Sequence, residues 1–319
     1  MLARVATGAA LLVVIMAGPG VVAQSRGGSS ALIGRWDLVV QSGRGNAPSW
    51  LEVERSGRAT LVGRFVGPGG SARPIAKIEA DDDGTFRFAI PPQWESHPGD
   101  ITFEGRLTGD RLAGTMTSGN GQTSTWTGSR APSLRRATPP VWGEPITLFD
   151  GTSLDGWEPI GRGTSEWRAT GGVLANAKSG ANLRTTRTFD DFKLQLEFRV
   201  PEGANSGVYL RGRYELQVDD AVGLEPSSHH LGGVYGFLAP SENVARPAGE
   251  WQSMEVTLVG RMITYVLNGT TVICNREIPG ITGGALDSAE GEPGPIMLQG
   301  DHGPVEYRNI VITPATSTR

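Results

Sequence analysis

The feature that most restricts this chain is a two-residue alternation of apolar and polar side chains, which recurs in many short segments. No segment of ten or more residues has the 3.6-residue period of an amphipathic helix. Glycine and proline, 46 and 21 residues, are scattered between the alternating segments, where they favour tight turns. The sequence therefore predicts an all-β protein built from short strands.

Residues 31–131 are predicted to form a small antiparallel β domain. Segments 59–66, 85–90 and 101–107 alternate, and turn residues separate them at intervals typical of a meander that closes toward a barrel. No cluster in this part has a catalytic pattern, so we expect a packing partner, with a ligand-holding barrel as the alternative. Residues 132–143 are a proline-rich, semi-rigid linker.

Residues 144–315 form the second predicted domain, a β-sandwich. Segment 193–200 alternates without a break and places Leu194 and Phe198 on one face, with Glu197 on the other. Asn268-Gly269 is typical of a two-residue hairpin with positive φ at both positions. We expect the single cysteine, Cys274, to be a small buried residue.

Charge and cysteine content exclude several classes of protein. The net charge is −4 without a basic stripe, which argues against a nucleic-acid partner. One cysteine permits neither an intrachain disulfide nor a thiolate metal cluster. Residues 1–23 have the charged start, apolar stretch and small-residue end of a secretory signal, followed by a Gly/Ser leader at 24–30. We therefore expect a periplasmic or secreted protein without a membrane span in its mature chain.

Several motifs of the second domain resemble the 3-keto-disaccharide hydrolase family. They include Thr147-Leu-Phe-Asp-Gly-Thr-Ser-Leu-Asp-Gly-Trp157, Asn205-Ser-Gly-Val-Tyr-Leu-Arg211, Tyr214-Glu-Leu-Gln-Val-Asp219 and Gln299-Gly-Asp-His-Gly303, in that order. The resemblance covers residues 144–314. It implies a concanavalin A-like jelly-roll sandwich that acts on glycosides whose glucose ring carries a ketone at C3.

The strand at 214–219 contains the most informative polar residues. Alternation places Glu215, Gln217 and Asp219 on one face. At about 3.3 Å per residue the outer two lie about 13 Å apart. A pair of carboxylates in an ordinary glycosidase lies about 5–9.5 Å apart. This spacing disfavours a hydrolase of unoxidised glucans.

The resemblance implies a different reaction, in which a base removes the proton at C2, the C1 substituent leaves by β-elimination, and water adds back. The candidate bases are His302, Glu215 and Asp219, because each can accept a proton. Arg211 or a bound cation is the candidate stabiliser of the enolate. Calcium is the divalent cation that the acidic loop residues would suit, although no twelve-residue calcium loop is present.

The predicted substrate-binding residues come from several strands and loops. They are Glu197, Gln217, Tyr235, Trp251 and Gln299. Two hypotheses follow for the function. The first is an exported enzyme that cleaves 3-keto-glucosides, and the number of ionisable groups expected on one face favours it. The alternative is a non-catalytic, glycan-binding β-sandwich, because fold alone does not decide function.

Overall fold

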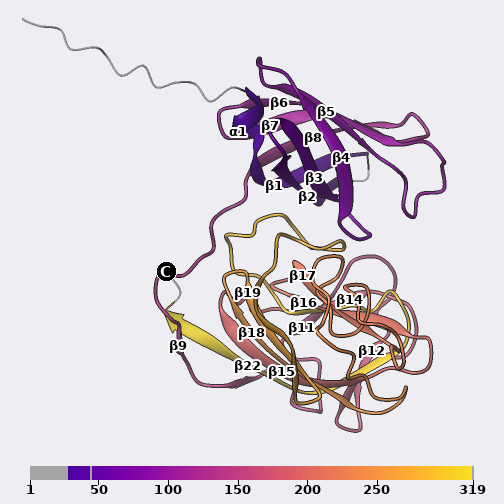
Figure 1. Ribbon diagram of the computed structural model, residues 1–319. Coiled ribbons are helices and arrows are strands. Elements are labelled where there is room, and N and C mark those ends of the chain that lie inside the picture. Colours follow the sequence, from indigo (N-terminus) through magenta and orange to yellow (C-terminus); the bar gives the residue numbers. More distant parts are fainter. Residues whose placement is uncertain (1–27, 44, 318–319) are drawn as a thin grey trace, which may run out of the picture.

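The computed structural model describes residues 28–43 and 45–317, in which an eight-stranded barrel stacks on a two-sheet sandwich (Figure 1). This arrangement confirms the predicted all-β fold. The predicted signal at 1–23 lies outside the described residues. The end of the predicted leader is helical, because α1 spans Gly28–Leu32. Within the described residues, no helix has the length and hydrophobicity needed to cross a membrane.

The barrel is an up-and-down meander whose neighbouring strands all pair antiparallel. It closes because β1 pairs with both β2 and β8. Its interior is filled by aromatic and aliphatic side chains, among them Trp36, Phe65 and Phe103. The strands are β1 Gly34–Ser42, β2 Gly45–Ser56, β3 Thr60–Val66, β4 Arg73–Ala80, β5 Thr85–Ile90, β6 Ile101–Thr108, β7 Arg111–Thr117 and β8 Thr123–Arg130.

The sandwich consists of a nine-stranded and a five-stranded sheet. In the larger sheet the order is β12-β13-β22-β15-β18-β19-β20, and β9 and β10 also pair with β22. Its strands are β9 Val141–Trp142, β10 Ile146–Thr147, β12 Trp167–Thr170, β13 Val173–Asn176, β15 Phe192–Arg199, β18 Gln252–Val259, β19 Met262–Leu267, β20 Thr270–Glu277 and β22 Val305–Ser317. The smaller sheet has the order β11-β14-β21-β16-β17. Its strands are β11 Trp157–Ile160, β14 Asn182–Thr185, β16 Asn205–Leu210, β17 Tyr214–Asp219 and β21 Met297–Leu298.

The alternation of the sequence is reproduced in the packing of the sandwich. The apolar residues of β15, including Leu194 and Phe198, are buried between the sheets, as predicted. Asn268 and Gly269 both have positive φ, 51° and 81°, which confirms the predicted turn between β19 and β20. The prediction for Cys274 was wrong, because its side chain is exposed on β20. It lies in a strand whose pairing with β19 shifts register, so alternation does not assign its face.

The barrel is fixed to the sandwich by a packed interface. Trp50 of β2 is fully buried and lies edge-on to Phe237 of the sandwich, with ring centroids 5.4 Å apart. Gly280 of the sandwich leaves room for the Trp50 ring, because a Cβ there would lie 2.2 Å from the indole nitrogen of Trp50. The Ser288 hydroxyl donates to the backbone carbonyl of Leu38 at 2.5 Å.

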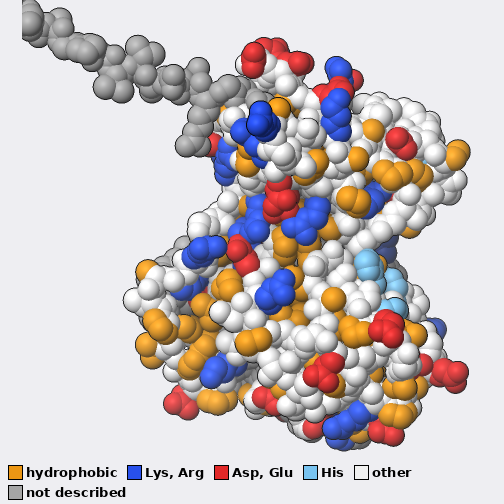
Figure 2. Space-filling view, viewed as in Figure 1, with side chains coloured by type: hydrophobic (Ala, Val, Ile, Leu, Met, Phe, Trp, Pro, Cys, Tyr) orange, Lys and Arg blue, Asp and Glu red, His pale blue; other side chains and the backbone are white. Residues whose placement is uncertain are grey.

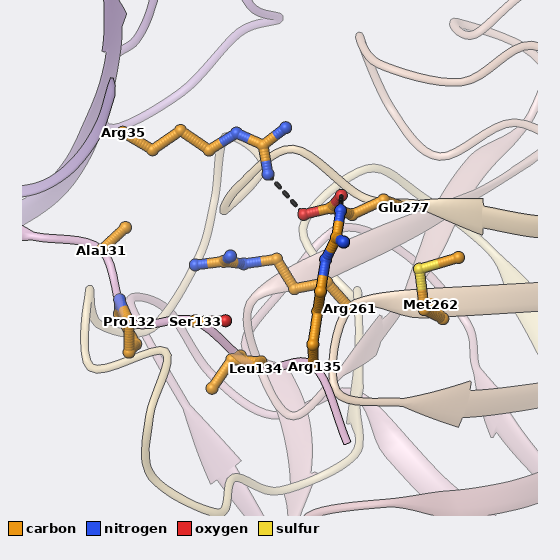
Figure 3. A pocket seen from close by; sticks show the side chains of 9 residues that line it. All are labelled: Arg35, Ala131, Pro132, Ser133, Leu134, Arg135, Arg261, Met262 and Glu277. Atoms are coloured by element: carbon orange, nitrogen blue, oxygen red, sulfur yellow. Dashed lines mark hydrogen bonds and ion pairs between the residues drawn. The ribbon is translucent and has the colours of Figure 1, made fainter. Parts of the chain in front are cut away.

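Charged side chains hold the edge of the same interface (Figure 3). Arg35 of the barrel forms an ion pair with Glu277 of β20, with Nη1 and Oε1 2.6 Å apart. Arg135 of the linker approaches Glu277 from the other side at 3.6 Å. The next linker residue, Arg136, binds Asp191 at 2.6 Å. The linker is thus held against the sandwich, and Arg35 joins the barrel to the same Glu277 side chain.

Candidate functional site

A cavity of about 240 Å³ lies where the outer face of the five-stranded sheet meets the barrel. Figure 2 shows histidine side chains gathered on the flank of the sandwich just below the barrel. The cavity is lined by polar side chains of the sandwich and by one loop of the barrel: Pro68, Gly69, Gly70, Asn182, Asn205, Tyr209, Glu215, Gln217, Tyr235, Gly283, Gly284, Gln299, Asp301 and His302.

Strands β16 and β17 place the central side chains of this cavity. Leu216 and Val218 of β17 belong to the sandwich core. Glu215 and Gln217, which alternate with them along the strand, therefore face the other way, into the cavity. Glu215 lies opposite Tyr209 in the ladder. Gly207 of β16 leaves room for the acid, because a Cβ there would lie 2.5 Å from the Glu215 Oε1 atom.

The Glu215 carboxyl is almost completely buried, with 4% of the residue exposed. Burial raises its pKa to about 8, although the Tyr209 hydroxyl and the nearby His302 oppose this shift. Its backbone N–H donates to the Thr282 hydroxyl at 2.9 Å, which fixes the strand at this point. At neutral pH the carboxyl is therefore largely protonated and can donate a proton.

His302 lies at the rim of the cavity, half-exposed, next to Asp301. Its Nδ1 atom is 2.7 Å from the Asp301 Oδ1 atom. This hydrogen bond is the main reason why the pKa of His302 is raised. The turn is held by Asn176, whose side-chain amide donates to the carbonyls of Gly300 and Gly303 at 3.0 and 2.8 Å. Because Nδ1 is engaged, Nε2 is the nitrogen free for proton transfer.

Amide side chains provide further polar atoms in the cavity. Gln299 is largely buried, and its Oε1 atom has no hydrogen-bond partner among the described residues. An unpaired acceptor in a cavity favours a ligand that brings a donor such as a hydroxyl. Gln217 donates to the Asn205 side chain at 3.2 Å. Tyr235 packs edge-on to His229, with centroids 5.3 Å apart.

Two predicted catalytic residues do not line the cavity. Arg211 is fully buried in the turn between β16 and β17, where it binds Asp190 at 3.1 Å and the Tyr214 hydroxyl at 2.9 Å. It therefore does not reach a substrate in this cavity. The Asp219 carboxylate accepts hydrogen bonds from the His230 ring and the Leu231 backbone, both at 2.7 Å, and so holds the neighbouring loop.

Two predicted substrate-binding residues lie on the outer face of the other sheet. Glu197 of β15 forms an ion pair with Arg308 of β22. Trp251 stacks with Arg308 and Arg199, whose guanidinium carbons lie 4.0 and 4.8 Å from the ring centre. The alternation rule placed Glu197 outward correctly, but it does not indicate which of two outward faces carries the cavity.

The structure adds residues that the sequence did not single out. Asn182 and Asn205 line the cavity from β14 and β16, and Tyr209 donates from its hydroxyl to the Gly283 carbonyl at 3.0 Å. Tyr209 was not singled out, because its place opposite Glu215 depends on the pairing of β16 with β17. The barrel loop at Pro68 gives no local signal, because its contact depends on the packing of the domains.

No group of three or more His, Cys, Asp or Glu side chains within the described residues has an arrangement that could hold a metal ion. Asp219 is engaged as described above, and Asp220 accepts from the Gly203 backbone N–H at 3.2 Å. The two carboxylates therefore have roles in holding loops.

The fold and the cavity define the class of this protein: a β-sandwich with a polar, ring-sized pocket outside one sheet, preceded by a barrel. The sequence profile described as the 3-keto-alpha-glucoside-1,2-lyase-like domain matches residues 144–313, just over half of the chain. The chain belongs to this family. The match covers the sandwich, and the barrel lies outside it.

Individual relatives are more distant. A 3-keto-disaccharide hydrolase of Bacteroides thetaiotaomicron is 22% identical over an alignment of 166 positions, and the match covers 40% of this chain and 57% of that protein. The match thus spans little more than half of the curated relative. Two solved structures from Parabacteroides distasonis, provisionally named glycosyl hydrolases, are also similar. One is 27% identical, with a TM-score of 0.45, over 56% of this chain and 92% of the other. The second is 25% identical, with a TM-score of 0.42, over 53% and 98%.

Proposed function

We propose that this protein is an exported carbohydrate-active enzyme that cleaves the glycosidic bond of 3-keto-glucosides. One observation carries the proposal: the cavity brings a buried, protonated carboxyl, Glu215, together with a histidine held by a carboxylate, His302. Membership of the 3-keto-alpha-glucoside-1,2-lyase-like family supports the substrate class. The signal pattern at residues 1–23 supports export.

In this proposal His302 is the base. The ketone at C3 acidifies the hydrogen at C2, and the Nε2 atom of His302 removes it, which leaves the electron pair in an enolate. The enolate then expels the C1 substituent, so that a C1–C2 double bond forms and the C3 ketone is restored. Asp301 orients the imidazole and stabilises its protonated form, as a carboxylate does for histidine bases in general.

Glu215 is the acid in the same reaction. As the C1–O bond breaks, the Glu215 carboxyl protonates the departing oxygen, for which its raised pKa suits it. Water then adds at C1 and a proton returns to C2, so the net result is hydrolysis. A neutral donor in the cavity, the second N–H of the Gln217 amide, takes the enolate-stabilising role for which Arg211 was predicted.

A glycan-binding function without catalysis is the second candidate. The four amide side chains of the cavity, Asn182, Asn205, Gln217 and Gln299, favour it, because amides are suited to bind sugar hydroxyls.

Incubation with defined substrates tests the two candidates. Purified protein is incubated with 3-keto-trehalose and a 3-keto-β-glucoside, with the unoxidised sugars as controls, and the release of 3-keto-glucose is measured. The enzyme proposal predicts release from oxidised substrates alone. Saturable binding without release would contradict it and support the glycan-binding function.

A further inference from the structure

The barrel contributes part of the cavity wall. Pro68, Gly69 and Gly70, in the loop between β3 and β4, line the cavity opposite the sandwich. The Pro68 carbonyl accepts a hydrogen bond from the Gly284 backbone N–H at 3.0 Å. The contact is close, because a Cβ on Gly283 would lie 2.1 Å from the Gly70 carbonyl oxygen. The cavity is therefore complete only with the barrel in place.

A second barrel loop, between β5 and β6, supports the first. The Gln93 side chain accepts from the Ser71 backbone N–H at 3.3 Å and donates to the Ser71 hydroxyl at 2.6 Å. Arg73 and Glu95, both largely buried, form an ion pair at 2.9 Å. These contacts give the loop that reaches the cavity a fixed shape, which a binding wall requires.

Trp94 of the second loop is exposed beside the cavity. It is 62% exposed, although tryptophan is usually well buried. Its indole lies against the glycine loop, because a Cβ on Gly70 would lie 2.7 Å from the indole nitrogen. Gly70 lines the cavity, so the Trp94 ring lies directly against one of the lining residues, and an indole suits a position that is apolar on one side and wet on the other. The C–H groups on one face of a sugar ring suit such a surface.

We propose that the barrel builds an outer subsite for the leaving group of the substrate, with Trp94 as its stacking platform. The cavity, about 240 Å³, is smaller than the 300–1,000 Å³ usual for drug-sized ligands, so it takes one sugar ring. The second ring of a disaccharide must then extend out of the cavity, past the glycine loop on which Trp94 packs. The inference rests on the proposed function, since it concerns the leaving group of that reaction.

The test compares a substrate with two rings and a substrate with one. Trp94→Ala is expected to raise KM for a 3-keto-disaccharide about 3–10-fold, while kcat/KM for methyl 3-keto-glucoside changes less than about twofold. Trp94→Phe, which keeps a ring, should restore most of the loss. Val141→Ala is the control, because Val141 is equally exposed, at 61%, and belongs to β9 of the nine-stranded sheet and not to the barrel.

Binding to the Glu215→Gln protein, measured by calorimetry, separates this inference from the proposed function. Adding Trp94→Ala should weaken the Kd for the 3-keto-disaccharide about 3–10-fold, whether or not the parent protein cleaves either substrate. Lack of turnover by the parent protein would overturn only the proposed function. Equal effects of Trp94→Ala on one-ring and two-ring ligands, or no effect on either, would overturn the outer subsite.

Discussion

The two outward faces of the sandwich carry similar polar residues, but the residues have different partners. On the nine-stranded sheet, Glu197 pairs with Arg308, and Arg199 pairs with Glu306. On the five-stranded sheet, Glu215 has no ion-pair partner within the described residues and is covered by the barrel. The first face is a set of solvated ion pairs, and the second contains a buried acid that has only the half-exposed His302 nearby and no ion pair among the described side chains.

This difference shows which polar strand face is a candidate site. A half-exposed ion pair is stable at little energetic cost and contributes about 0–1 kcal/mol. A buried carboxyl without a cation shifts its pKa upward instead, as Glu215 does. Such perturbed groups concentrate at functional sites. The partners of an acid, more than its place in an alternating strand, therefore distinguish the two faces.

The largest expected effect comes from removing the acid. Glu215→Gln should lower kcat for a 3-keto-disaccharide about 10²–10⁴-fold, because the neutral amide cannot protonate the departing oxygen. Glu197→Gln makes the same chemical change on the other face and should leave kcat within about twofold. Steady-state kinetics of both variants provide the measurement. Equal losses in both would remove the distinction between the faces.

The pH dependence of the rate is expected to have two limbs, one set by His302 and the other by Glu215. The rate should fall below the raised pKa of His302, where the imidazole is protonated, and above about pH 8, where Glu215 ionises. Asp301→Asn removes the hydrogen bond that raises the histidine pKa, so the acid limb should move to lower pH, toward the ordinary value of about 6.5. The alkaline limb should also move slightly to lower pH, because the Asp301 charge helps to raise the pKa of Glu215, and kcat should fall about tenfold.

A matched change tests this interpretation of the profile. Asp219→Asn alters a carboxylate that also contacts a histidine, His230, but outside the cavity lining. Its pH profile should keep both limbs at their original positions. If the acid limb moved in Asp219→Asn and not in Asp301→Asn, the limb would report His230, and His302 would not be the base.

Local patterns predicted much of the fold and part of the site. Alternation placed Glu215 and Gln217 on one face, and the turn at Asn268 followed from its two residues. These features depend on neighbours in sequence. The burial of Arg211 and the barrel wall at Gly70 depend on how separate sheets and domains pack. Alternation contains no information about that packing, which is why Arg211 and Trp251 were predicted at a cavity that they do not line.

The stability of the protein should also respond to Glu215. Its pKa is raised to about 8, so between its unfolded value near 4.5 and pH 8 the folded state binds a proton that the unfolded chain has released. Stability is therefore lost as pH rises through this range. Glu215→Gln should increase the free energy of unfolding at pH 7 by about 1–3 kcal/mol. Urea unfolding at pH 7 and pH 4 measures the effect.

The difference in the free energy of unfolding between Glu215→Gln and the wild-type protein should vanish near pH 4. At that pH both the folded and the unfolded wild-type protein carry the protonated acid. Glu197→Gln again provides the comparison, because Glu197 is paired and partly exposed. It should change the free energy of unfolding by less than about 1 kcal/mol at either pH. A loss of stability in Glu215→Gln at pH 7 would mean that the carboxyl is ionised in the folded protein.

The smallest effect is expected for Trp251, on the outer face of the nine-stranded sheet. The guanidinium groups of Arg199 and Arg308 both lie against the Trp251 ring, and a partly exposed cation–π contact contributes about 0.5–1 kcal/mol. Trp251→Ala should lower stability by about that amount and leave KM for one-ring and two-ring substrates within about twofold. Because each guanidinium also keeps its carboxylate partner, the face should retain its shape. A substrate-dependent rise in KM for Trp251→Ala would instead place sugar binding on the nine-stranded sheet.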